Sequence, residues 1–212
     1  MKKVFLFGLL IAASIYRISA QEISQMKPVV YGEAGFGFGQ TLFFGNMKQN
    51  LSKSFDGGAF EPGVGSNLMI GFYIAPERWR GLGLGSRVKG TFGSSVKGDF
   101  DDRYIINYYS VMASAKYFPF SKKFNKGAYT RLSYGFGQFT SKRMNEETDR
   151  YLHQYAIGSS FMGGIGYAFP FRKTVISLEA EFEYSARNGT VDGIGSTTFT
   201  CGQIGGNIIV SF

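Results

Sequence analysis

Residues 176–184 read ISLEAEFEY, with an apolar side chain at every second position and a polar one between. Successive side chains of a β-strand point to opposite faces, so this pattern predicts a strand with one apolar and one acidic face. The acidic face carries Glu179, Glu181 and Glu183. Alternation alone does not say which of the two faces points inward.

Similar alternation recurs along the chain. We predict eight strands, at residues 29–40, 64–75, 82–93, 104–118, 128–140, 154–169, 174–187 and 199–212. Each is long enough to cross a bilayer when tilted, which takes about 9–11 residues, whereas no apolar segment after residue 20 reaches the roughly 20 residues of a spanning helix. The expected fold is all-β, an eight-stranded antiparallel up-and-down transmembrane β-barrel.

The direction of the apolar face separates a soluble barrel such as a lipocalin from a membrane barrel, whose apolar face points outward. The polar face mixes glycines with charges of both signs, which suits a narrow lumen. Connections after the second, fourth and sixth strands are short or contain proline, as periplasmic turns do. Aromatic residues collect near strand ends, where interfacial girdles would lie: Tyr73, Tyr109, Tyr117, Tyr134, Tyr167, Phe169 and Tyr184.

The charged residues are divided between the short turns and the polar strand face in a way that also favours a membrane barrel. The formal net charge of the 212-residue chain is +8. The short turns are basic, so they would face anionic headgroups. The polar strand face predicts a balanced luminal network, since an unpaired buried charge is costly. Its members are Glu33, Arg87, Lys89, Lys116, Arg131, Glu179, Glu181 and Glu183.

The N-terminus has the composition of a signal peptide. Lys2 and Lys3 precede an apolar run over residues 4–15, and Ala20 offers a small residue for cleavage. We therefore expect residues 1–20 to direct export and residues 21–212 to form the barrel domain. The single cysteine, Cys201, excludes an internal disulfide.

The last predicted strand ends on an aromatic residue, with apolar residues at alternate positions before it: Ile208, Val210 and Phe212. This ending resembles the assembly signal that barrel-assembly machinery reads in bacterial outer-membrane proteins. The chain as a whole resembles the small eight-stranded outer-membrane β-barrels of the Bacteroidetes type, similar in layout to OmpX and the OmpA barrel. The resemblance implies an outer-membrane location after export. We expect contacts with outer-membrane lipids and lipopolysaccharide, and a monomer.

Three functions remain open. The leading one is a non-enzymatic surface scaffold that serves envelope integrity, adhesion or ligand contact. An enzyme that modifies lipid A would need a serine close to the only histidine, His153, and the nearest serines are Ser159 and Ser160. A narrow pore is disfavoured because side chains fill an eight-stranded interior.

Neither a cofactor nor a metal is expected. Asp99, Asp101 and Asp102 lack the spacing of an EF-hand loop. Nucleic acid is not expected as a partner either, because the basic surplus lies in the turns rather than in an aromatic groove.

The first long connection, residues 41–62, is unusually aromatic. Loops of this length commonly bind a ligand or a partner, or are disordered. Its rings would form either a surface contact site or an extension of the outer girdle: Phe43, Phe44, Phe55 and Phe60.

Overall fold

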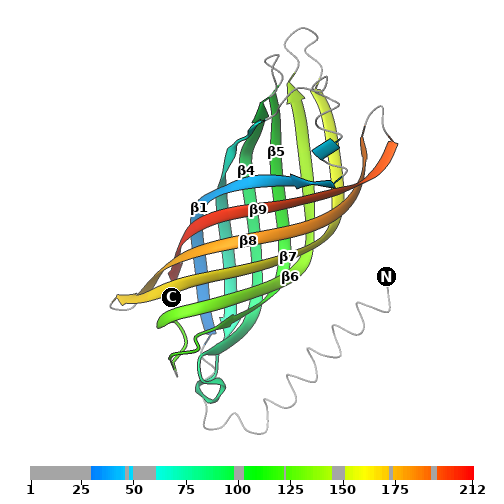
Figure 1. Cartoon of the computed structure of the whole chain (residues 1–212). Coiled ribbons are helices and arrows are strands. Elements are labelled where there is room, and N and C mark those ends of the chain that lie inside the picture. Colours follow the sequence, from blue (N-terminus) through cyan, green and yellow to red (C-terminus); the bar gives the residue numbers. More distant parts are fainter. Residues whose placement is uncertain are drawn as a thin grey trace, which may run out of the picture.

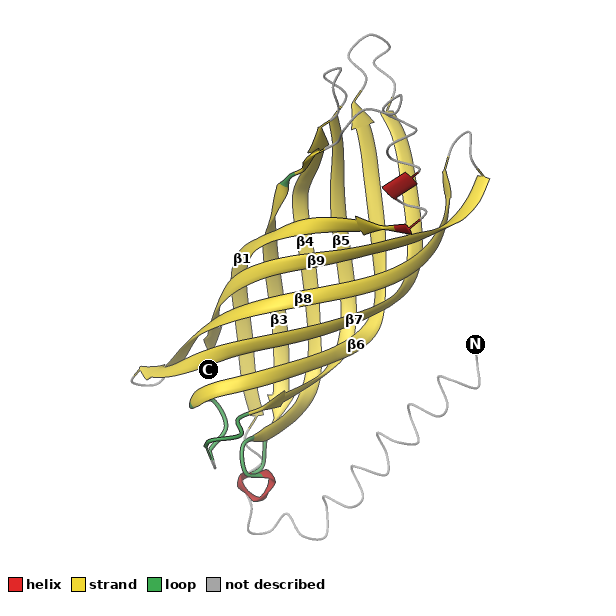
Figure 2. Cartoon of the chain, viewed as in Figure 1, coloured by secondary structure: helices red, strands yellow, loops and turns green. Residues whose placement is uncertain are grey.

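The computed structural model describes residues 30–45, 48–49, 61–97, 103–121, 123–144, 151–171, 174–191 and 195–212. Eight long strands form a closed barrel (Figures 1 and 2). Their bounds are β1 Val30–Phe44, β3 Val64–Ile74, β4 Leu82–Lys97, β5 Arg103–Tyr117, β6 Gly127–Met144, β7 Tyr151–Phe171, β8 Thr174–Val191 and β9 Gly195–Ser211. A two-residue strand, β2 (Glu61–Pro62), pairs with β4, and a 3-10 turn, η1, spans Glu77–Trp79.

The strands follow the order β4-β3-β1-β9-β8-β7-β6-β5, and pairing of β4 with β5 closes the barrel. Every pairing is antiparallel. The C-terminus completes the closure, because the backbone N–H groups of Gly32 and Phe212 each donate to the other residue's carbonyl, at 2.9 and 3.0 Å. The predicted eight-stranded antiparallel barrel is confirmed.

Several strands are longer than the sequence pattern predicts. β7 has 21 residues, which at about 3.3 Å per residue is roughly 70 Å along the strand. Tilted by about 45°, such a strand rises roughly 50 Å, against a hydrocarbon core of about 30 Å. The strands therefore continue beyond the membrane, because backbone pairing persists after the apolar pattern ends.

Side chains are arranged inside out relative to a soluble barrel. Ile70 and Ile165 are 70% and 66% exposed on the outer surface, whereas Arg87 and Arg131 are 1% exposed. An apolar exterior on a closed barrel is the signature of a transmembrane β-barrel. Within the described part of the chain, no helix combines the length and apolarity needed to cross a bilayer.

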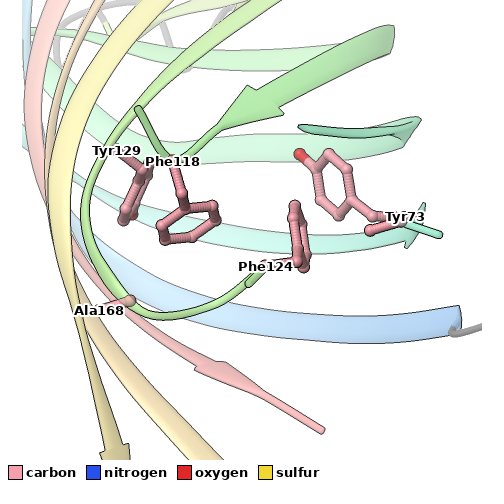
Figure 3. Close-up of a cluster of buried hydrophobic side chains, with 6 residues drawn as sticks. Tyr73, Phe118, Phe124, Tyr129 and Ala168 are labelled. Atoms are coloured by element: carbon pink, nitrogen blue, oxygen red, sulfur yellow. The ribbon is translucent and has the colours of Figure 1, made fainter. Parts of the chain in front are cut away.

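The end of the barrel that carries the β3–β4, β5–β6 and β7–β8 connections, here called the turn end, is plugged by an aromatic cluster (Figure 3). Asn125 and Gly127 have φ angles of 62° and 85°, and this reversal lets Phe124 point back into the barrel. The cluster consists of Tyr73, Ala75, Phe118, Phe124, Tyr129 and Ala168.

The prediction that Tyr73 belongs to an outer girdle is wrong. Its side chain is fully buried in the lumen, and its hydroxyl lies 2.8 Å from Ser114 Oγ. Tyr73 shares its strand face with buried Asn67 and Met69, so its position in the alternation sends it inward. The other predicted girdle aromatics lie on the exposed outer face: Tyr109, Tyr117, Tyr134, Tyr167, Phe169 and Tyr184.

A bulge extends β4 past its predicted end at residue 93. The register with β5 shifts between Thr91 and Ser94. Gly93 has a φ of 69°, a left-handed conformation that favours glycine, and its N–H donates to Asn107 Oδ1 at 3.0 Å. The strand pair therefore continues to Lys97 and Arg103.

Candidate functional site

The predicted luminal charges come from strands on opposite walls. β8 supplies Glu179, Glu181 and Glu183, and β4, which supplies Arg87 and Lys89, lies four strands away in either direction around the barrel. β1 and β6, which carry Glu33 and Arg131, are also four strands apart. Ion pairs between these strands must therefore span the lumen.

At the turn end, Glu33 receives two cations. Its carboxylate pairs with Lys116 Nζ and, at 2.8 Å, with Arg131 Nη2. Arg131 Nε lies 3.1 Å from Glu179 Oε2, which links this group to β8. Lys116 Nζ also lies 4.3 Å from the centre of the Tyr129 ring. The ammonium is thus held between one carboxylate and the aromatic cluster.

In the middle of the lumen, Glu181 is bound from across the barrel. Its oxygens lie 2.7 Å from Arg87 Nη2 and 2.5 Å from Lys89 Nζ. Arg87 Nη1 is 3.4 Å from Glu179 Oε1, so one guanidinium contacts two glutamates of β8. Short, charge-assisted contacts of this kind are about twice as strong as neutral hydrogen bonds.

Toward the other end, here called the loop end, Glu183 is the last acid of the series. Lys89 Nζ lies 3.5 Å from it and Arg187 Nη2 3.1 Å. Ser160 Oγ donates to Glu183 Oε1 at 2.5 Å. The Arg187 guanidinium also lies 5.2 Å from the centre of the Tyr108 ring.

These contacts form one chain of alternating charge along the lumen. The side chains in it are 0–4% exposed. At the level of the chain, which we call the ion-pair chain, the lumen is therefore closed to solvent by the protein's own side chains. Its order is Glu33, Arg131, Glu179, Arg87, Glu181, Lys89, Glu183 and Arg187, with Lys116 attached to Glu33.

Arg187 is the member that the sequence analysis missed. It continues the period-two series of β8 after Glu183 and Ser185, but it stands at the predicted end of the strand. With Arg187, the ion-pair chain contains five cations and four anions among the described residues, so the expectation of equal luminal charge is wrong by one cation. The period-two series itself was the signal that could have identified it.

Neutral polar side chains occupy the space beside the ion-pair chain. Lys89 Nζ donates to Gln203 Oε1 at 2.5 Å, and Thr91 Oγ1 donates to Asn67 Oδ1 at 2.7 Å. Asn67 Nδ2 in turn donates to Asn207 Oδ1 at 3.2 Å. The luminal network thus includes amides and hydroxyls of β3, β4 and β9 as well as charges.

Luminal glycines leave room for these long side chains. A Cβ atom on Gly137 would lie 2.7 Å from Arg187 Nη2 and 2.7 Å from the Tyr109 carbonyl, whereas one on outward-facing Gly206 would meet nothing within 4 Å. We expect Gly137→Ala to lower the free energy of unfolding by about 1–3 kcal/mol, the usual cost of overpacking. Urea unfolding in micelles, followed by fluorescence of the only tryptophan, Trp79, measures this. The matched control Gly206→Ala should change stability by less than about 0.5 kcal/mol; equal effects would contradict the steric explanation.

The aromatic residues assigned to the first loop do not all lie in a loop. β1 extends to Phe44, so Phe43 and Phe44 are strand residues. Phe43 is buried, and the Phe44 ring stacks on Tyr184 at 6.3 Å between centroids. Pairing of β1 with β9 continues to this point, which explains the longer strand. Phe55 and Phe60 lie outside the described residues.

Residues considered for catalysis are far apart or already engaged. His153 lies in β7 opposite Lys142. Ser160 is seven residues farther along the same strand, roughly 23 Å away at about 3.3 Å per residue. The hydroxyl of Ser160 is bonded to Glu183, and Ser159 is its immediate neighbour on the strand. A serine and a histidine must lie within hydrogen-bond reach to act together.

Metal and thiol chemistry receive no support from the residues that the structure describes. Among them, no group of three or more His, Cys, Asp or Glu side chains could hold a metal ion. Asp99, Asp101 and Asp102 fall outside these residues. Cys201 is free and buried, with its Sγ 3.1 Å from Ser185 Oγ.

The predicted assembly signal forms the outer face of the last strand and the C-terminal residue. Ile208, Val210 and Phe212 are 39%, 38% and 67% exposed. Their recognition by barrel-assembly machinery stays a prediction, as does the signal peptide at residues 1–20, which lies outside the described residues.

Comparison with known proteins shows the fold. No family model matches the chain, and no curated protein matches it. Among solved structures, Ail, the attachment invasion locus protein of Yersinia pestis, is 16% identical, with 88% of this chain and 100% of Ail covered and a TM-score of 0.53. A second structure of Ail, in complex with the heparin analogue sucrose octasulfate, is 14% identical, with 86% and 99% covered and a TM-score of 0.51. The chain therefore has the fold of the small bacterial outer-membrane β-barrels, while the Bacteroidetes type stays a prediction.

Proposed function

We propose that this protein is a non-enzymatic scaffold of the outer membrane, whose closed barrel presents external loops for envelope integrity, adhesion or ligand contact. The ion-pair chain is the observation that carries this proposal. It fills the lumen with buried side chains from opposite walls, which favours a rigid support over a conduit. Outer-membrane lipids and lipopolysaccharide would surround the barrel, which we propose to be a monomer.

The length of the strands supports a role at the cell surface. β6, β7, β8 and β9 have 18, 21, 18 and 17 residues, well above the 9–11 that a membrane crossing needs. Paired strands therefore carry the bases of the connections at the loop end beyond the membrane. Binding residues commonly lie on loops that a rigid scaffold positions.

Attachment is one of the roles that this fold serves. The similar protein Ail is an attachment invasion locus protein, and one of its structures contains the heparin analogue sucrose octasulfate. We propose surface contact for the present chain on the same architecture, through the connections that follow β1, β4, β6 and β8.

The enzyme alternative is weaker, because His153 and Ser160 are separated along β7 and the hydroxyl of Ser160 donates to Glu183. The pore alternative conflicts with the burial of Arg87, Lys89 and Glu181 in the middle of the lumen.

The closed lumen predicts that the purified, refolded protein conducts no ions. In planar bilayers at 1 M salt we expect no discrete current steps, because the ion-pair chain leaves no aqueous path. Replacing Arg87, Lys89 and Glu181 by Ala removes the middle of that chain but leaves the aromatic cluster at the turn end in place. The variant expected to conduct therefore also replaces Phe118, Phe124 and Tyr129 of that cluster by Ala. Single-channel recording measures both. Regular steps from the unmodified protein would instead establish the pore and reject the closed scaffold.

A further inference from the structure

The outer surface of the barrel contains a furrow across five strands. These strands, β1, β9, β8, β7 and β6, lie side by side on one face of the barrel (Figure 1). The register places Gly206 opposite Ala180, Ala180 opposite Ile165 and Ile165 opposite Thr130. Gly206 and Ala180 carry almost no side chain and form the low floor of the furrow, which the exposed Ile165 borders on the side toward β6.

Large side chains form the walls. The neighbouring row toward the turn end runs through Ile208, Leu178 and Tyr167, and the row toward the loop end through Ile204 and Phe182. The open depression over this floor is lined by Ile208, Leu178 and Tyr167, continues to Phe120 at the turn end, and has a volume of about 800 Å³. This is within the range of small-molecule sites, which is about 300–1,000 Å³.

The furrow descends toward the turn end. It starts beside Phe38, eight residues from the start of β1, and ends beside Thr130, three residues from the start of β6. Four strand spacings of about 4.8 Å give a length of roughly 19 Å. Because the strands are tilted by about 45° from the membrane normal, the furrow descends by roughly 13 Å along that normal. This is close to the thickness of one leaflet of the hydrocarbon core, about 15 Å. A lipid chain of the leaflet at the turn end could therefore lie along it.

A basic site follows where the furrow ends. Phe120 and Tyr167 line both the furrow and a second depression of about 660 Å³ at the turn end. The second depression is also lined by the exposed lysines Lys123 and Lys126, and among its described lining residues no side chain is acidic. The apolar furrow on the outer surface thus leads directly to the ammonium groups of Lys123 and Lys126 at headgroup level.

We propose that this surface is a specific site for an anionic phospholipid of the leaflet at the turn end. One acyl chain lies in the furrow over Gly206 and Ala180, and the phosphate lies beside Lys123 and Lys126. Apolar shape complementarity and charge act together at this surface. Phosphate groups attract lysine as a compact point charge.

Native mass spectrometry of the folded protein in micelles tests this with phosphatidylglycerol and with phosphatidylcholine of the same acyl chains. We expect one phosphatidylglycerol to remain bound per barrel. Replacing Gly206 and Ala180 by Leu fills the furrow and should weaken binding of both lipids about tenfold. Lys123→Gln with Lys126→Gln should reduce the preference for phosphatidylglycerol about 25-fold, since each basic residue at a membrane surface contributes about fivefold.

Matched variants elsewhere on the barrel control for folding and net charge. Ala113→Leu, at an exposed position of β5, matches the Ala180→Leu change of the furrow variant, and Arg78→Gln with Arg80→Gln removes the same charge from the β3–β4 turn. Neither should change lipid binding, and all variants must keep the heat-modifiable gel shift of a folded barrel. Equal binding by the furrow and control variants would overturn the proposal. A dimer that only the furrow variant dissociates would also overturn it, because the face would then bind a second copy of the chain.

Discussion

Replacing Glu181 by Gln is expected to lower the free energy of unfolding by about 3–5 kcal/mol, the usual cost of breaking a buried ion pair. Glu181 lies 2.7 Å from Arg87 Nη2 and 2.5 Å from Lys89 Nζ, and these side chains are at most 2% exposed. Gln has the same shape but no charge, and its amide would leave two buried cations sharing the remaining glutamates. The loss should therefore far exceed that of an ordinary polar substitution.

Urea unfolding of the refolded protein in micelles, followed by Trp79 fluorescence, measures this difference. Glu77→Gln is the matched control, because Glu77 is an exposed residue of the β3–β4 turn. Exposed charges contribute roughly 0–1 kcal/mol. If the two variants lost the same small amount, the lumen would have to be hydrated and open, and the closed scaffold would give way to a pore.

The positions of the strands could be predicted because alternation with period two is a local property of the sequence. The ion-pair partners cannot be identified from this local property, since Arg87 and Glu181 are 94 residues apart and Arg131 and Glu33 are 98 residues apart. Their contact depends on the register of all the strands between them. The sequence analysis grouped these charges on one face, but it could not say which glutamate each cation binds.

Two residues, one omitted from the predicted luminal set and one placed on the wrong face, did have a local signal. Arg187 continues the alternation of β8, and Tyr73 has the luminal position in the alternation of β3. Both lie near the ends of their strands, where few residues remain to define the alternation. Phe124 is different, because a turn with left-handed Asn125 brings it into the lumen. Strand periodicity contains no information about such a turn residue.

Neutralising Glu33 should lower the free energy of unfolding as much as neutralising Glu181 does. At Glu33, a second substitution made in addition to the first gives a sharper test. Glu33→Gln leaves Lys116 Nζ facing the aromatic cluster and Arg131 with Glu179 as its remaining ion-pair partner in the described chain. Only Arg131 then retains a carboxylate. We expect a loss of about 3–5 kcal/mol, which Lys116 causes for the most part because it becomes an uncompensated buried charge.

A second substitution, Lys116→Met, should then restore stability. Met keeps an unbranched apolar chain of similar length, and its sulfur packs well against rings such as Tyr129, which lies 4.3 Å from the lysine ammonium. In the unmodified protein, Lys116→Met should destabilise, because it removes a cation from Glu33. In the Glu33→Gln protein the same change should stabilise, and the difference between its effects in the two backgrounds should fall in the usual range of coupling between contacting residues, about 0.5–3 kcal/mol. Unfolding of the four proteins of this cycle measures the sign directly. If Lys116→Met destabilised both backgrounds equally, Lys116 would be held by the aromatic rings alone, and Glu33 would not be the carboxylate that compensates its charge.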